Sequence, residues 1–71
     1  MYYPRIKELR LEQGRTQVNV STMIGIDQSY YSKYERGAQN ITLEVIIKIA
    51  QLYNVSVDYL IGRTDKRELN K

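Results

Sequence analysis

The four glycines of this 71-residue chain divide it into short segments whose apolar residues are spaced for helices. Within these segments, apolar side chains recur every three or four positions instead of alternating, which is the period of an amphipathic α-helix. Gly14, Gly25, Gly37 and Gly62 each follow such a segment, where a left-handed residue commonly ends a helix. The one proline, Pro4, suits the first turn of a helix. The pattern therefore predicts an all-α fold.

Five helices are expected, and in chain order they span about 4–13, 17–23, 27–36, 43–53 and 57–61. Thr16, Asp27, Thr42 and Ser56 stand at the start of the last four helices. Each of these side chains carries an oxygen that can accept a hydrogen bond from a free amide of the first helical turn. The fourth helix has the clearest apolar stripe, so it is expected to supply much of the core.

Length and composition restrict the class of protein. Seventy-one residues fit one domain with a modest core, so we expect the domain at residues 1–62 and a charged, fraying tail at residues 63–71. Without cysteine or histidine, we expect no disulfide, no metal site and no cofactor. No apolar run approaches the roughly 20 residues of a membrane span, so we expect a cytoplasmic protein with no membrane partner. The net charge of +3 indicates a polyanionic partner.

The most specific motif runs from Thr16 to Gly37 and consists of two short helices joined through a glycine turn. Its residues at the motif positions are Gln17, Ser21, Gly25, Ile26, Gln28, Ser32, Glu35 and Gly37. In this register the chain resembles the helix-turn-helix of the Cro and phage-repressor family, also called the xenobiotic-response-element type. The similarity continues through both later helices. It implies a five-helix lambda-repressor-like domain that regulates transcription, most often as a repressor, by binding double-stranded DNA.

One face of the third helix suits base recognition. At 100° per residue, Gln28, Ser29, Ser32, Lys33 and Arg36 share that face, and none of them is apolar. Glutamine can pair with adenine and lysine can donate to guanine. Serine can form hydrogen bonds with either base. We therefore expect Gln28, Ser29, Ser32 and Lys33 to read bases in the major groove.

Other residues are expected to contact the DNA backbone. Gln17, at the first turn of its helix, and Arg36, at the end of the recognition helix, suit phosphates. Gln39 and Asn40 follow in a loop that similar proteins lay along the sugar-phosphate backbone. For Tyr30 two interpretations stay open, because the helical wheel places it near the core and the resemblance places it at the edge of the DNA surface.

The resemblance also assigns structural roles. It implies that Arg10 and Glu35 form an ion pair between the first and third helices, so neither is counted as a DNA contact. Arg15 stands where the family commonly has a leucine, so Leu11 is expected to fill that volume in the core. The basic residues of the tail are interleaved with Asp65 and Glu68, which favours a solvated tail over a DNA-binding arm.

Apolar residues outside the expected core stripes indicate an assembly. Val45, Leu52, Val57 and Tyr59 are surplus to those stripes, so we expect a two-fold homodimer that uses the fifth helix and covers some of them. Such a dimer would place two recognition helices ~34 Å apart and would match a palindromic operator.

The two other classes of function for a chain of this kind are an enzyme and a protein-binding module. An enzyme is not expected, because the chain lacks histidine, cysteine and a phosphate-binding glycine loop. The alternative to a DNA-binding regulator is an antitoxin-like protein-binding module, which can bind DNA as well. No small-molecule effector is evident from the sequence.

Overall fold

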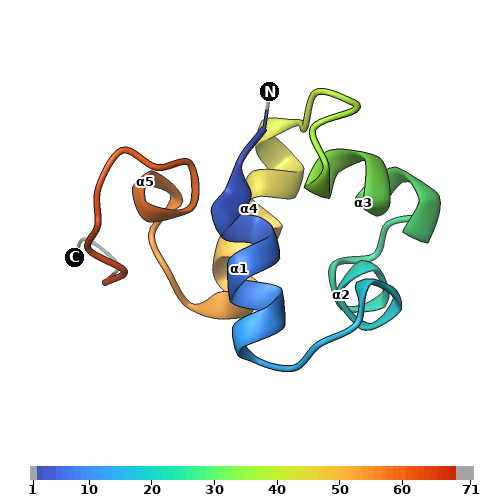
Figure 1. The fold of residues 1–71 in the computed structure, drawn as a ribbon, viewed down its shortest axis with the longest axis horizontal. Helices are drawn as coiled ribbons and strands as arrows, with labels where there is room; N and C mark the ends of the chain where they lie inside the picture. Colours follow the sequence, from blue (N-terminus) through green and yellow to red (C-terminus); the bar gives the residue numbers. More distant parts are fainter. Residues whose placement is uncertain (1, 69–71) are drawn as a thin grey trace.

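The computed structural model describes residues 2–68, which form five α-helices and, within that range, no β-strand. The helices are α1 (Pro4–Glu12), α2 (Gln17–Ile24), α3 (Gln28–Glu35), α4 (Leu43–Tyr53) and α5 (Val57–Leu60). Figure 1 shows α1 and α4 at the centre of the view, with α2 and α3 to one side and α5 to the other. The expected all-α fold is confirmed, and each helix boundary lies within one residue of its expected place.

Side-chain caps explain where α2, α3, α4 and α5 begin. The expected caps are all in place, and each accepts a hydrogen bond from a first-turn amide at 2.8 to 3.3 Å. They are Thr16, Asp27, Thr42 and Ser56. A cap of this kind stabilises its helix by roughly 1 kcal/mol, which matters for helices as short as these.

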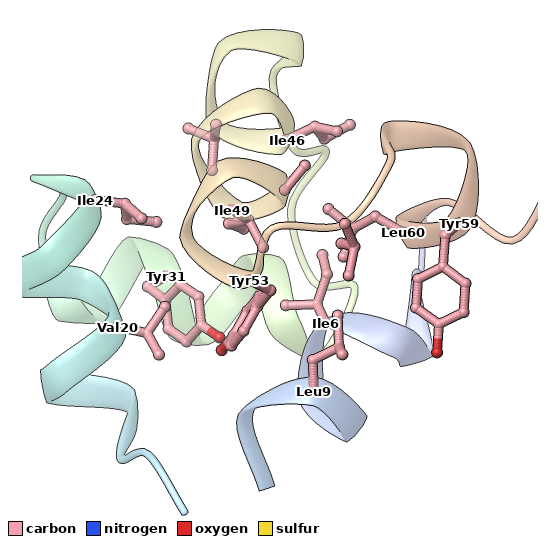
Figure 2. Close-up of a cluster of buried hydrophobic side chains, with 13 residues drawn as sticks. Ile6, Leu9, Val20, Ile24, Tyr31, Ile46, Ile49, Tyr53, Tyr59 and Leu60 are labelled. Carbon is pink, nitrogen blue, oxygen red and sulfur yellow. The ribbon is translucent and has the colours of Figure 1, made fainter. Parts of the chain in front are cut away.

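The core is centred on α4, and every other helix contributes to it. Figure 2 shows Tyr31 of α3 and Tyr53 of α4 next to each other at the middle of the cluster, close to Val20 of α2. Leu60 of α5 and Ile6 of α1 fill the other end of the same cluster. A single continuous core therefore holds α3 in place from its buried side.

Three residues lie elsewhere than expected. Val45 and Tyr59, which were expected to be surplus apolar residues, are 7% and 8% exposed and belong to the protein's own core. Leu11 is 58% exposed, so the expectation that it fills the core was wrong. The physical reason is that α1 turns the face carrying Ile6 and Leu9 inward, and Leu11 lies two residues, or about 200°, beyond Leu9.

The segment that follows α5 packs back onto α1 instead of fraying. Arg67 donates two hydrogen bonds to the Glu12 carboxylate, at 2.8 and 2.9 Å. Arg5 donates to the carbonyl of Thr64 and, at 2.6 Å, to Asp65. The expectation that the tail frays is therefore wrong for residues 63–68, because hydrogen bonds to residues of α1 hold this segment in place. Residues 69–71 lie outside the described part of the chain.

Tyr59 anchors this C-terminal segment. The guanidinium groups of Arg5 and Arg67 lie 4.1 and 5.3 Å from the centre of its ring, within the range of cation–π attraction. Arg67 also donates to the Tyr59 hydroxyl at 3.1 Å. With its guanidinium engaged in this way, Arg67 is held against Glu12 of α1 and Tyr59 of α5.

Candidate nucleic-acid interface

A tight turn sets α3 across α2. Gly25 has a φ of +75°, a left-handed conformation that costs a residue with a Cβ roughly 1–2 kcal/mol. The amide of Ile26 donates to the carbonyl of Ser21 at 3.0 Å and closes the end of α2. Ser21 is buried, and its hydroxyl donates to the Val18 carbonyl at 2.9 Å, so this polar group is satisfied inside the domain. The turn thereby fixes the direction in which α3 leaves α2.

The residues expected to read bases lie together on the outer side of α3. Gln28, Ser29 and Lys33 are exposed, and Ser32 is half-buried. Arg36, exposed as well, follows directly after the helix. Because the opposite side of α3 is buried in the core, the helix presents this polar side to solvent as one surface.

Ser29 also stabilises the start of α3, apart from any contact with DNA. Its amide and its hydroxyl both donate to the Asp27 carboxylate, at 2.8 and 2.6 Å. These hydrogen bonds hold the pKa of Asp27 below its usual range, so the cap is charged at neutral pH. The Ser29 hydroxyl is therefore committed as a donor and offers DNA its acceptor lone pairs.

Tyr30 lies on the solvent side of α3. Its side chain is 50% exposed, which excludes the interpretation that Tyr30 packs in the core. The Lys33 ammonium lies 5.7 Å from the centre of the Tyr30 ring, at the outer limit of a cation–π contact. The aromatic ring thus forms an edge of the polar surface beside a residue expected to read bases.

Arg10 and Glu35 are joined by two hydrogen bonds, both at 2.9 Å, which connect α1 to the end of α3. Glu35 is 3% exposed, and it also accepts a hydrogen bond from the Gln17 amide at 3.2 Å. Arg10 reaches further, to the carbonyl of Arg15 at 3.0 Å. This polar cluster ties three helices together beneath the α2–α3 surface.

Burial and hydrogen bonding shift the pKa of the Glu35 carboxylate in opposite directions. Burial raises the pKa of Glu35, but hydrogen bonds from Arg10 and Gln17, together with the nearby Tyr31 hydroxyl, lower it, and the net pKa is below its usual range. The same pairing raises the pKa of Arg10. Both groups are therefore charged at neutral pH. The bond from Gln17 to Glu35 was missed in the sequence, and it gives Gln17 a structural contact in addition to its expected phosphate contact.

The remaining expected backbone contacts follow α3 in the loop before α4. Asn40 is exposed and Gln39 is half-buried. A cleft of about 350 Å³ opens between α1, α2 and α3 on this side of the domain, and Gln17, Ser32 and Arg36 line it. Tyr2 and Lys7 line it too, although the sequence had not singled them out. Lys7 stands three residues before Arg10 on one face of α1, which is the signal that could have found it.

Two kinds of site are absent from residues 2–68. None of the helices there combines the length and the apolar character needed to cross a lipid bilayer. Those residues also contain no cluster of three or more carboxylate side chains that could hold a metal ion.

A family model described as helix-turn-helix matches residues 6–60, which include all five helices except the start of α1. The chain belongs to this family. Its Cro and phage-repressor type comprises DNA-binding regulators of transcription, as the residues of α2 and α3 had indicated. The matched residues include Gly25 in the turn and both partners of the Arg10–Glu35 ion pair.

Named relatives support the same assignment. The chain is 38% identical to the uncharacterized HTH-type transcriptional regulator YobD of Bacillus subtilis, over 92% of this chain and 58% of YobD. It is 32% identical to the cryptic phage CTXphi transcriptional repressor RstR of Vibrio cholerae, over 92% of this chain and 59% of RstR. It thus spans somewhat more than half the length of these helix-turn-helix relatives.

A solved helix-turn-helix protein has the same fold. The complex of the SinR protein with the SinI protein superposes with a TM-score of 0.79 at 32% identity, covering 86% of this chain and 60% of that chain. SinR is a protein of Bacillus subtilis with an N-terminal DNA-binding domain.

Proposed function

We propose that this helix-turn-helix protein binds double-stranded DNA sequence-specifically, represses transcription and has no enzymatic activity. The observation that carries the proposal is the polar outer side of α3. Its base-reading candidates are displayed together on a helix whose other side is fixed in the core. A helix presented in this way fits the major groove, which admits one α-helix. The name of its relative RstR, a transcriptional repressor, supports the sign of regulation.

The residues divide into two roles. Gln28, at the start of α3, lies where recognition helices reach deepest into the groove, and Lys33 lies further along the exposed side. These two, with Ser29 and Ser32, read bases. Arg36 holds phosphates at the end of α3, together with Gln17, Gln39, Asn40 and the exposed edge of Tyr30.

The division of roles predicts different losses for two variants. Gln28→Ala should weaken binding to the preferred operator by roughly 1–3 kcal/mol and flatten the preference at one base pair per half-site. Arg36→Ala should weaken binding to all sequences alike and reduce the salt slope by about 0.9. The measurement is a titration of each variant against the operator selected from random DNA, its single-base variants and unrelated DNA, at several salt concentrations.

Lys48→Ala is the matched control, since Lys48 lies on α4 and pairs with Glu44 at 3.4 Å. It should leave base preference unchanged. If Gln28→Ala lost affinity equally on every sequence while Arg36→Ala changed the preferred base, the C-terminal end of α3 would be the part that faces the bases.

We further propose that the protein binds a palindromic operator as a two-fold homodimer. Leu43 and Ile47 of α4 are exposed, at 66% and 40%. By helical geometry Leu43 and Ile47 share one face of α4, and Leu43 lies one turn before Ile46, which Figure 2 shows on the side of α4 near Leu60 of α5. With the half-buried Val57 of α5, they form the apolar surface that a second copy would cover.

Dimerisation can be tested by one charge on that surface. Ile47→Lys should shift the protein from dimer to monomer in sedimentation velocity runs at tens of micromolar. It should also weaken binding to the full operator much more than binding to a half-site. Met23→Lys is the control, because Met23 is also exposed, at 59%, but lies on α2. Monomer in the wild type at high micromolar concentration without DNA would contradict a preformed dimer.

A further inference from the structure

The C-terminal segment, residues 63–68, holds α5 from the side opposite Val57. Tyr59, which this segment contacts, lies two positions, or about 200°, beyond Val57, so the two side chains point in nearly opposite directions. We propose that Arg67, through Tyr59 and Glu12, positions α5 for dimerisation. The inference rests on the homodimer proposed above, and it names a positioning residue outside the apolar surface that the second copy would cover.

The helix α5 is too short to hold its own position. Its four residues make a single turn, and an isolated turn is unstable because nucleation fixes several residues for one hydrogen bond. Leu60, at 1% exposed, anchors one side of α5 in the core. The direction in which the other sides point therefore depends on what holds Tyr59.

Backbone hydrogen bonds join the C-terminal segment to both ends of α5. At the start of the helix, the amide of the cap residue Ser56 donates to the Arg67 carbonyl at 3.0 Å. Towards its end, the Arg63 amide donates to the Asp58 carbonyl at 2.8 Å. The segment thus runs alongside α5 and returns to its first residues, which places the Arg67 side chain next to Tyr59.

Arg67 connects α5 to α1. Its guanidinium donates two hydrogen bonds to the Glu12 carboxylate, at 2.8 and 2.9 Å, and such bidentate pairs are stronger and more specific in direction than single contacts. These bonds hold the pKa of Glu12 below its usual range, so the carboxylate is charged at neutral pH. The same guanidinium donates to the Tyr59 hydroxyl at 3.1 Å. One side chain therefore links the last residue of α1 to the middle of α5.

Arg5 supports Tyr59 from the other end of α1. Its guanidinium lies 4.1 Å from the centre of the Tyr59 ring and donates to the Tyr59 carbonyl at 2.8 Å. It also donates to Asp65 of the C-terminal segment at 2.6 Å. The Tyr59 ring is thus held by two arginines, each with an acidic partner, while Val57 on the opposite side of α5 stays half-buried.

Loss of these contacts should weaken the dimer more than the fold. A chain in which α5 has moved must restore its position before it pairs, so the apparent affinity falls with the fraction of chains in the competent position. Both copies of a homodimer must be competent, so this fraction enters twice. A fall to about one third of the chains raises the dissociation constant of the dimer about tenfold.

Arg67→Ala tests the proposal, with Arg63→Ala as the matched control. Both variants lose one arginine of the C-terminal segment, but the Arg63 side chain is 75% exposed and its Nε lies 3.9 Å from the Asp58 carboxylate. Well below the unfolding midpoint, sedimentation equilibrium should give a dimer dissociation constant about tenfold higher for Arg67→Ala and unchanged for Arg63→Ala. Both variants should bind an operator half-site equally, since neither change touches α3.

Glu12→Ala separates positioning from direct contact with the partner. If Arg67 acts through Glu12, the double variant Glu12→Ala with Arg67→Ala should raise the dissociation constant by clearly less than the product of the two separate factors. Factors that multiply in full would show that the two residues act independently, and would overturn the proposal.

Hydrogen exchange measures the order of α5 apart from the dimer. In the Ile47→Lys background, Arg67→Ala should speed exchange of the Leu60 amide, which donates to the Ser56 carbonyl within α5. Exchange of the Tyr31 amide in α3 should stay the same. A general loss of stability would speed both amides, so this comparison distinguishes local release of α5 from a weaker fold.

The possible results distinguish this inference from the homodimer itself. A wild type that is monomeric at high micromolar concentration, and that binds its operator without pairing, would contradict the dimer and with it any role of α5 there. A dimeric wild type with the same dissociation constant as Arg67→Ala would overturn the positioning role alone and leave the dimer standing.

Discussion

Replacing Glu35 with alanine should destabilise the domain by roughly 3–5 kcal/mol, because the change strands the Arg10 guanidinium without its partner in a mostly buried site. A chain of this length has a total stability of roughly 0.05–0.15 kcal/mol per residue, so the loss is comparable to the whole. Urea unfolding followed by circular dichroism measures it. We expect the variant to be largely unfolded at a temperature where the wild type is folded.

Glu44→Ala is the matched control for this loss. Glu44 pairs with Lys48 at 3.4 Å on the surface of α4, and exposed pairs of this kind contribute about 0–1 kcal/mol. A second variant, Arg10→Met with Glu35→Leu, removes both charges and should recover much of the stability. If Glu35→Ala kept the wild-type unfolding midpoint but lost operator binding, Glu35 would belong to the DNA contacts and not to the structure.

The Glu35 pair also predicts a pH dependence. Its pKa is lower in the folded state than the ordinary value of 4.5, so the unfolded chain binds the proton more readily. The contribution of the pair is therefore fully present above about pH 4.5 and is lost as the pH falls below it. The double variant Arg10→Met with Glu35→Leu should lose less stability than the wild type between neutral pH and pH 4.

Replacing Tyr31 with alanine should cost roughly 3–5 kcal/mol, the range for removing a fully buried aromatic side chain. Tyr31 is 0% exposed and lies against Tyr53 and Val20 in Figure 2, so its loss leaves a cavity at the centre of the core. Tyr30→Ala is the control on the same helix, since Tyr30 is half exposed, and it should change stability by about 0.5 kcal/mol or less. Thermal and urea unfolding give both values.

Tyr31→Phe separates the contribution of the ring to stability from that of the hydroxyl. The buried hydroxyl of Tyr31 forms no hydrogen bond of normal geometry within the described residues, so its removal should be close to neutral. Burial, and then the nearby Glu35, raise the pKa of Tyr31 above its ordinary value of 10.0. Stability should therefore fall as the pH rises above about 10, and less steeply in Tyr31→Phe. A loss above about 2 kcal/mol in Tyr31→Phe at neutral pH would contradict this account of the hydroxyl.

Local features of the sequence were sufficient to predict the helices and the polar side of α3. The caps at Thr16 and Asp27 and the left-handed turn at Gly25 depend on interactions within a few residues, so their positions can be predicted without knowing the fold. The polar side of α3 follows from the helical period alone. The pairing of Arg10 with Glu35 was different, because only the resemblance to a family implied it.

Tertiary packing decided what lies between the helices. Lys7 joins Arg36 at one cleft, and Arg67 returns to Glu12 across fifty-five positions of the chain. Tyr59 is covered by that returning segment, whereas Ile47 stays exposed. A helical period shows which residues share a face but not which neighbour the face meets. The sequence by itself therefore determined the helices and the polar side of α3, and only the packing of distant segments decided which side chains line the cleft and which apolar residues stay exposed.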